Sequence, residues 1–402
     1  MDLILPQKPL GAMDRLAGGK RERGPLEQEA FREKMIHHLL RERGRRCGHF
    51  SPLMLASLLP LLLFLMAAAC SAPAASSGLV VVLAPTPAPA TPRPVLLPAD
   101  EAPHEDLSEW WYYTGHLKSE SGKQYGFELV VFQAVRGENP VGYAAHFAIT
   151  DHQRESFSFD QKTDKALRIQ GDGRYRLEVG GWQMGGEGDD HFLRAHNGRY
   201  GLDLRLHSTK PPALHGGSGW ISFGPVGDSY YYSRTHMEVE GTLQDGAETE
   251  RVSGLAWMDH QWGNFILVNG GGWDWFSLQL SDGTEVMVTV LRDQPGSVPA
   301  TYGSHVDREG RVTDLKAEDI GLEVTDRWRS PHSGAVYPSG WELELPHQDL
   351  ELHIEPVLAD QELNTINSAG VIYWEGEVRA SGSRNGIPLF GEGYVELTGY
   401  AR

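Results

Sequence analysis

The sequence predicts an all-β protein built from antiparallel strands. From about residue 104 to the end, short runs rich in Val, Tyr, Trp, Phe and Thr alternate with Gly, Asp, Asn and Ser. Turn residues recur about every 8–12 residues, which is typical of a β-barrel or β-sandwich. The segments 117–123 and 280–284 place such residues between two strand-like runs and indicate hairpins. No amphipathic pattern longer than about three helical turns competes with this assignment.

The strand-rich region divides into two similar halves. A strand–turn–strand pattern at 111–132 parallels one at 273–291, and the pair of runs at 237–257 parallels the pair at 376–397. Internal similarity of this kind indicates a repeated structural unit. We therefore expect two β-domains, at 101–265 and 266–402, which join near the three glycines at 270–272.

The first 70 residues have the layout of an export signal. Four arginines between positions 41 and 46 precede an apolar run from Pro52 to Ala69, which ends in small residues before Cys70. This order is typical of a secretory signal, and the small residues before the cysteine resemble those of a bacterial lipoprotein. We expect lipidation at Cys70 and a membrane-anchored protein that faces outside the cytoplasm. An uncleaved transmembrane anchor is the alternative, since about 18 apolar residues can just cross a bilayer.

Residues 71–100 form an Ala/Pro-rich linker, which favours an extended conformation. Segment 1–70 holds 11 of the 36 basic and 7 of the 54 acidic residues, so residues 71–402 keep 25 basic and 47 acidic residues and a net charge of −22. Such a surface argues against nucleic acid as a partner. The only other cysteine is Cys47, so the folded part contains no disulfide and depends on core burial.

Aromatic and acidic residues gather in three places, and strand alternation sorts them into faces. In the first cluster Glu109, Trp111 and Tyr113 share one face, while Trp110 and Tyr112 share the other. The other clusters divide in the same way. Trp257 and Asp259 point opposite to His260 and Trp262, and Trp273 and Trp275 point opposite to Asp274. Buried Trp is common core material, but a carboxyl group in an aromatic pocket is also how an acid catalyst is kept protonated.

Four motifs in order resemble the AttH/CrtC family, which includes carotenoid 1,2-hydratases and AttH-like secreted proteins. They are HEDLSEWWY at 104–112, WMDHQWG at 257–263, GWDWFSLQL at 272–280, and YWEG at 373–376 with GYVELTGY at 393–400. The resemblance spans roughly residues 100–402. It implies two consecutive lipocalin-like antiparallel β-barrels. The family is functionally mixed, so the resemblance supports the fold better than any one reaction.

The resemblance also implies candidate catalytic residues, namely Asp259, His260 and Asp274. Hydration of a C=C bond needs an acid, which Asp259 or Asp274 would supply, and an attacking water; His260 would orient the acid or deprotonate the water. Aromatic faces would stabilise the carbocation by roughly 2 kcal/mol in a dry site. Gln261 stands where many relatives carry Glu, which removes one possible second carboxylate. The expected substrate-binding residues are Glu109, Trp111, Tyr113, Trp257, Trp262, Trp273 and Trp275.

Two functions remain open from the sequence. One is acid-catalysed hydration of a hydrophobic, polyene- or isoprenoid-like molecule, and the other is a non-catalytic lipocalin-like carrier of such a ligand. We expect no cofactor and no metal, because no phosphate-binding or dinucleotide-binding fingerprint is present and the pairs His191/His196 and His146/His152 have no signature spacing. The segment His215–Gly219 is a Gly-rich turn rather than an esterase loop, since no Gly-x-Ser-x-Gly motif accompanies it.

Overall fold

The computed structural model describes residues 92–134, 142–164, 169–171, 174–223, 227–264, 271–292, 298 and 300–401. The predicted signal segment 1–70 with Cys70, and residues 71–91 of the predicted linker, lie outside this range. So does residue 270 of the predicted junction. Among the described residues, no helix has the length and apolar character needed to cross a bilayer.

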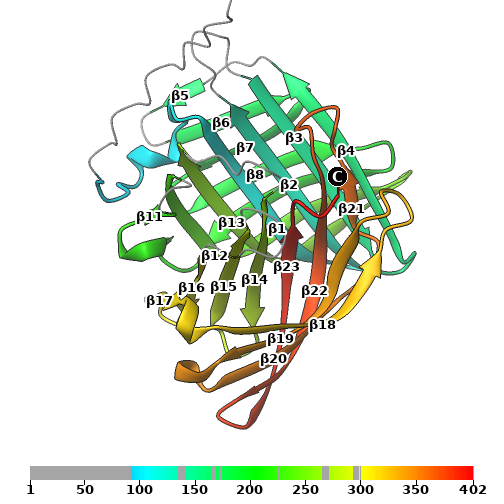
Figure 1. Cartoon of the computed structure of the whole chain (residues 1–402). Helices are drawn as coiled ribbons and strands as arrows, with labels where there is room; N and C mark the ends of the chain where they lie inside the picture. Colours follow the sequence, from blue (N-terminus) through cyan, green and yellow to red (C-terminus); the bar gives the residue numbers. More distant parts are fainter. Residues whose placement is uncertain are drawn as a thin grey trace, which may run out of the picture. The chain divides into compact units, whose positions relative to one another are not determined.

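The strands between residues 108 and 263 form one antiparallel sheet (Figure 1). Its strands are β1 (Ser108–Ser119), β2 (Gln124–Ala134), β3 (Gly142–Asp151), β4 (Ser156–Asp164), β5 (Ile169–Gly171), β6 (Arg174–Val179), β7 (Trp182–Glu187), β8 (Asp190–His196), β9 (Tyr200–Ser208), β10 (Ala213–Leu214), β11 (Trp220–Ser222), β12 (Asp228–Asp245) and β13 (Glu248–Gly263). The order is β4-β3-β2-β1-β13-β12-β9-β8-β7-β6-β5, with β10 and β11 also paired to β12. The two ends of this order approach each other, because Lys162 of β4 lies over the Trp182 ring of β7. The sheet is therefore barrel-like, and we call it the first barrel.

The strands between residues 272 and 397 repeat this plan in a second antiparallel sheet, which we call the second barrel. Its strands are β14 (Gly272–Leu280), β15 (Glu285–Arg292), β16 (Ala300–Val306), β17 (Val312–Lys316), β18 (Gly321–Arg329), β19 (Val336–Leu345), β20 (Leu350–Pro356), β21 (Glu362–Asn364), β22 (Ile372–Arg384) and β23 (Ile387–Leu397). The order is β17-β16-β15-β14-β23-β22-β20-β19-β18, with β21 on β22. In the part of the chain that the structure describes, the short 3₁₀ turns are η3 (Ala99–Glu101), η4 (His215–Gly217), η6 (Ala317–Asp319) and η7 (Pro346–Gln348). The predicted fold of two consecutive antiparallel β-barrels is confirmed.

The first strands of the two barrels occupy equivalent places. β1 pairs with β2 and with β13, the last strand of its sheet, and β14 pairs with β15 and with the last strand β23. The two strands differ in which residues point outward. Trp110 stacks on Trp273 with ring centroids 6.4 Å apart, and Tyr112 meets the edge of Trp275 at 5.2 Å. Trp273 therefore points out of its own barrel, as Trp110 does. The sequence repeat had aligned Trp273 with Trp111, the next residue along β1.

Strand alternation produces the three largest hydrophobic clusters of the described residues. One fills the first barrel and includes Trp111, Tyr113 and Trp262. A second fills the second barrel around Trp341 and Trp374. The third lies between the barrels and takes side chains from both: Tyr112, Val130, Tyr231, Trp257, Trp275, Met287 and Tyr394. Strands such as β1 are hydrophobic on both faces because one face lines a barrel and the other packs on the neighbouring barrel.

Candidate functional site between the barrels

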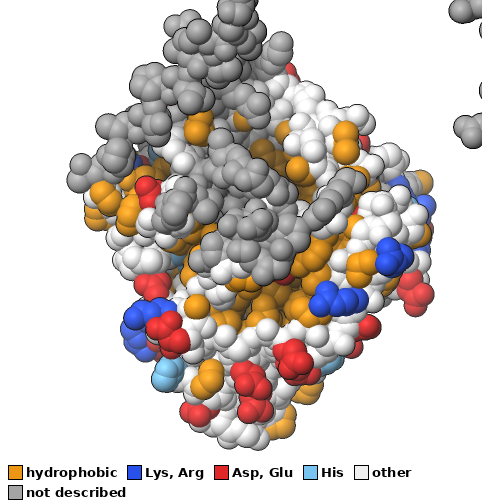
Figure 2. Space-filling view, viewed as in Figure 1, with side chains coloured by type: hydrophobic (Ala, Val, Ile, Leu, Met, Phe, Trp, Pro, Cys, Tyr) orange, Lys and Arg blue, Asp and Glu red, His pale blue; other side chains and the backbone are white. Residues whose placement is uncertain are grey.

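An aromatic pocket lies where the two barrels meet. Its lining includes two carboxylic acids, one from each barrel: Asp259 and Glu396. The other lining residues are Trp110, Tyr112, Phe132, Phe223, Tyr231, Gln261, Trp273, Trp275, Thr289, Leu291, Tyr302. Figure 2, viewed from the same side as Figure 1, shows hydrophobic side chains gathered near the middle of the molecule. We call this hollow the inter-barrel pocket.

The inter-barrel pocket is narrow. The cavity volume open to the centres of water molecules is about 50 Å³. One water requires roughly 10–15 Å³ on that measure, so the pocket has room for a few waters. A larger molecule would enter only if aromatic side chains moved. Trp110, Phe132 and Trp273 also line a neighbouring, wider and more open groove.

Asp259 is held by three hydrogen-bond donors. Its Oδ1 accepts from Trp257 Nε1 at 2.7 Å and from the Ser233 hydroxyl, and its Oδ2 accepts from the Tyr231 hydroxyl at 2.6 Å. Burial raises the pKa of Asp259 to about 6, although all three donors act in the opposite direction. The register explains this grouping, because Asp259 pairs with Ser233 on β12 and Trp257 lies two residues before it on the same face.

Glu396 reaches the same pocket from β23 of the second barrel. Its Oε2 accepts a hydrogen bond of 2.5 Å from Trp273 Nε1. Burial raises the pKa of Glu396 to about 7, the hydrogen bond from Trp273 lowers it, and the charge of Asp259 raises it further. The pocket therefore contains two carboxyl groups that titrate near neutral pH inside an aromatic environment.

Two further acids lie between the barrels. Glu375 Oε1 accepts a 2.6 Å hydrogen bond from the Tyr112 hydroxyl, and Glu128 Oε1 accepts one of 3.2 Å from the Tyr373 hydroxyl. The Oε2 atoms of Glu375 and Glu128 have no hydrogen-bond partner. Burial, and then the neighbouring carboxylates, raise the pKa of both side chains. Both side chains therefore favour the protonated form at neutral pH.

The predicted site residues fall into three places. Asp259, Trp273 and Trp275 line the inter-barrel pocket, and Trp257 lies in the hydrophobic cluster between the barrels. Trp111, Tyr113 and Trp262 lie in the core of the first barrel, and Glu109 and His260 are buried on the same face. The adjacent residues Asp259 and His260 thus point to opposite sides of β13, and the structure does not bring them together.

Asp274 lies in a third environment. Its carboxylate accepts hydrogen bonds from Arg292 Nη2 at 2.8 Å and from the Tyr400 hydroxyl at 2.8 and 3.0 Å. Burial raises its pKa, and Arg292 and Tyr400 oppose the shift. Asp274 does not line the inter-barrel pocket. Its partners are those of a buried ion pair.

Sequence reasoning missed Glu396, Glu375 and Glu128 as site residues. A signal for Glu396 was present, because it belongs to the GYVELTGY motif at 393–400. Glu396 and Asp259 reach the same pocket only through the packing of the two barrels. Strand alternation within one barrel does not predict that packing. Gln261, which lines the pocket, is not acidic. The second carboxyl group of the pocket comes instead from Glu396 of the other barrel.

The Gly-rich turn at His215–Gly219 also contributes to the site. Gly216, Gly217 and Gly219 have φ values of 65°, 73° and 82°, which only glycine adopts without strain. This conformation places His215 between the hydroxyl groups of Ser304, 2.8 Å from Nδ1, and Ser233, 2.7 Å from Nε2. Burial lowers the pKa of His215 to about 3, so the ring is neutral. It supports the Ser233 hydroxyl that donates to Asp259.

Comparisons with known proteins agree with this architecture. A family model described as AttH-like matches residues 88–400. The crystal structure of a Nitrosomonas europaea protein classed with AttH is 31% identical, covers 78% of this chain and 100% of its own, and superposes with a TM-score of 0.71. Kievitone hydratase from Nectria haematococca is 17% identical, with coverage of 76% and 93% and a TM-score of 0.62, and so shares the fold. No match was found among curated proteins.

Proposed function

The chain belongs to the AttH-like family, and from this premise we propose that it adds water to a carbon–carbon double bond of a hydrophobic molecule in the inter-barrel pocket. The observation that carries the proposal is the pair of carboxyl groups, Asp259 and Glu396, which face one aromatic pocket from two barrels. The structural neighbour whose name describes a hydratase provides a second line of support. The substrate class is polyene- or isoprenoid-like, because the pocket walls are mostly aromatic.

We assign proton delivery to Glu396 and the carboxylate role to Asp259. The three donors on Asp259 favour its charged form, whereas the pKa of Glu396 lies at about 7 and leaves a protonated fraction at neutral pH. This assignment differs from the sequence expectation, in which Asp259 or Asp274 is the acid. Asp274 takes no part, since Arg292 and Tyr400 occupy its carboxylate.

The proposed hydration begins with proton transfer from Glu396. Glu396 transfers its proton to one alkene carbon, the π electron pair forms the new C–H bond, and the other carbon becomes a cation. The faces of Trp273 and Trp275 and the charge of Asp259 stabilise that cation, each aromatic contact by roughly 2 kcal/mol in a dry site. A water attacks the cation, and its excess proton passes to Asp259. Proton exchange through the pocket waters restores Glu396.

The test uses the purified full chain with a hydrophobic extract of the producing cells, and with kievitone as a defined probe. Product analysis by mass spectrometry in D₂O should show the gain of one water and one carbon-bound deuterium. Glu396→Gln should lower the rate at least about 100-fold, while Glu342→Gln, on an exposed carboxylate, should leave it unchanged. Equal rates for Glu396→Gln and the wild type would exclude the assigned acid. Recovery of tightly bound but unaltered ligand would instead identify the protein as a carrier.

We also propose export and lipid anchoring at Cys70, supported by the segment from Pro52 to Cys70. Cells that express the chain and are labelled with a radioactive fatty acid should yield labelled protein in the membrane fraction. The Cys70→Ser variant should lose the label, whereas Cys47→Ser should keep it. Equal labelling of Cys70→Ser and the wild type would contradict lipidation at this position.

A further inference from the structure

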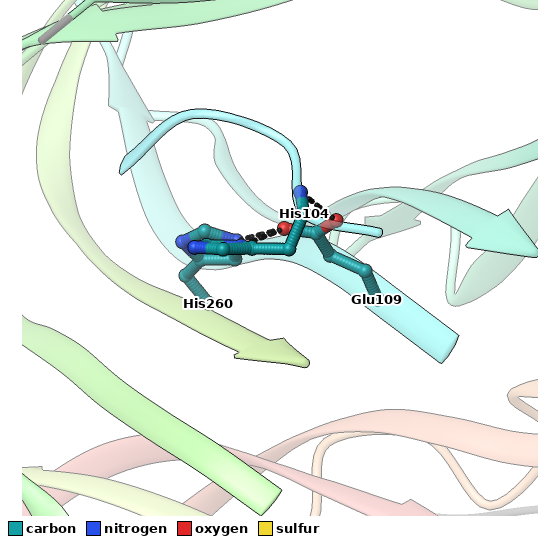
Figure 3. A group of neighbouring side chains, drawn as sticks. All are labelled: His104, Glu109 and His260. Carbon is teal, nitrogen blue, oxygen red and sulfur yellow. Dashed lines mark hydrogen bonds and ion pairs between the residues drawn. The ribbon is translucent and has the colours of Figure 1, made fainter. Parts of the chain in front are cut away.

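Three side chains with metal-binding atoms converge on the inner face of the first barrel, away from the inter-barrel pocket. Glu109 lies at the start of β1, His260 lies near the end of β13, and His104 lies on the segment before β1. His104 Nδ1 and His260 Nε2 are each 2.8 Å from the same oxygen, Glu109 Oε1. Figure 3 shows both imidazole rings directed at the Glu109 carboxyl group.

The spacing of these atoms suits one metal ion. All three candidate ligand atoms lie within 4.8 Å of one another. Nitrogen and oxygen ligands bind first-row divalent ions at about 2.0–2.2 Å, so neighbouring ligands 90° apart are separated by about 3 Å. The two N–O separations of 2.8 Å are close to that value. Two histidines and one carboxylate are also a recurrent ligand set for such ions.

The atoms that would not bind the ion are already held in place. His104 Nε2 lies 3.5 Å from the Asp100 carboxylate, and His260 Nδ1 lies 3.3 Å from the Tyr232 hydroxyl. Glu109 Oε2 accepts from the His104 backbone N–H at 2.7 Å and from Gln133 Nε2 at 2.9 Å. Metal-binding histidines and carboxylates commonly have outer partners of this kind, which fix the orientation of the ligand. The protein's surface His–carboxylate pairs are isolated, and the two histidines at the buried Glu377 contact different carboxylate oxygens, whereas His104 and His260 converge on one oxygen of Glu109.

The surroundings also fit a cation with access from outside. The side chains of Glu109 and His260 are fully buried, while the His104 side chain retains 16% exposure. His104 stacks on Trp262 with ring centroids 4.0 Å apart and an interplanar angle of 5°, so its ring is fixed. Asp100 and Glu109 bring two carboxylates to the cluster. Arg93 pairs with Asp100 at 2.6 Å and offsets the charge of that carboxylate.

We propose that His104, Glu109 and His260 bind one divalent transition-metal ion, such as Zn²⁺ or Co²⁺, with water at the remaining positions. The site uses none of the groups assigned to the hydration reaction, so either proposal stands if the other fails. The sequence did not indicate it, because His104 and His260 lie far apart in the chain and follow no metal-binding spacing. In the rival arrangement the two imidazoles share protons with Glu109 and no ion binds.

The experiment uses the untagged full chain with Cys47→Ser and Cys70→Ser, so that no thiolate competes for the ion. After treatment with a chelator, the protein is titrated with Co²⁺ and followed by visible absorption and by elemental analysis. We expect one equivalent of Co²⁺ per chain and binding at least 100-fold weaker in His104→Gln. His353→Gln is the matched control, because its imidazole pairs with Glu342 at the surface.

Glu109→Gln provides a second variant, and circular dichroism checks that each protein is folded before titration. Absence of stoichiometric binding by the folded wild type would establish the rival proton-sharing arrangement and overturn the proposal. Equal affinity of the wild type and His104→Gln would place the ion elsewhere and overturn it as well.

Discussion

At the scale of single residues, four acids next to aromatic side chains have four different partner sets. Asp259 takes three neutral donors, Glu396 takes an indole N–H, Glu109 takes two imidazoles, and Asp274 takes a guanidinium and a phenol. Sequence context makes Glu109, Asp259 and Asp274 look alike, since each lies beside or near a Trp, whereas Glu396 has only Tyr394 close by. The partners that determine the chemistry come from other strands.

Asp274→Asn should destabilise the protein without affecting ligand binding. The substitution leaves the Arg292 side chain, which is 15% exposed, without its ionic partner; breaking a fully buried pair costs about 3–5 kcal/mol, so the loss here should be somewhat smaller. The double variant Asp274→Asn/Arg292→Leu should recover part of that loss. Urea denaturation measures the free energy of unfolding, and unchanged stability of Asp274→Asn would contradict the structural role.

At the scale of elements, β2 of the first barrel lies close against β22 and β23 of the second. Gly126 in β2 faces Glu377 and Tyr394, and a Cβ atom at this position would be 2.5 Å from the Tyr394 hydroxyl. Glu377 in turn accepts hydrogen bonds from His116 at 2.8 Å and His152 at 2.7 Å. The junction is therefore close-packed and polar at this end, in contrast to the aromatic pocket.

Gly126→Ala should weaken the junction, because the added methyl group displaces buried side chains. Overpacking of this kind typically costs about 1–3 kcal/mol. Gly142→Ala in β3 is the matched control, since a Cβ atom there meets nothing within 4 Å. Thermal unfolding should show a lower midpoint for Gly126→Ala and little change for Gly142→Ala. Equal midpoints would mean that the junction relaxes without cost.

At the scale of the whole molecule, pH should control how firmly the barrels associate. Burial raises the pKa of Glu377, but His116 and His152 outweigh it and lower the pKa from 4.5 to about 2. Its contribution to stability is complete above pH 4.5 and is lost as pH falls toward 2. Glu128 behaves oppositely, since burial and the charge of Glu396 raise its pKa from 4.5 to about 8. Its contribution is complete below pH 4.5 and is lost as pH rises through 8.

The free energy of unfolding should therefore decline on both sides of a maximum at intermediate pH. Glu377→Gln should flatten the acidic side, and Glu128→Gln should flatten the alkaline side and raise stability above pH 8. Chemical denaturation at a series of pH values measures both effects. A Glu128→Gln profile that matches the wild type at alkaline pH would show that Glu128 is not protonated at the junction.

The internal repeat and the resemblance to the AttH/CrtC family predicted the two-barrel plan, and the sequence by itself determined the strands and the faces of the aromatic clusters. These properties are local: period-2 alternation shows that Trp110 and Tyr112 oppose Trp111 and Tyr113 wherever the strand packs. Tertiary structure alone decided what covers each face. Asp259 and Glu396 line one pocket only because the barrels pack against each other, with ring contacts between β1 and β14, and Glu109 meets His260 only through the pairing of β1 with β13. Alternation gives the direction of a side chain but not its distant neighbour, and that neighbour sets its hydrogen bonds, its charge and its chemistry.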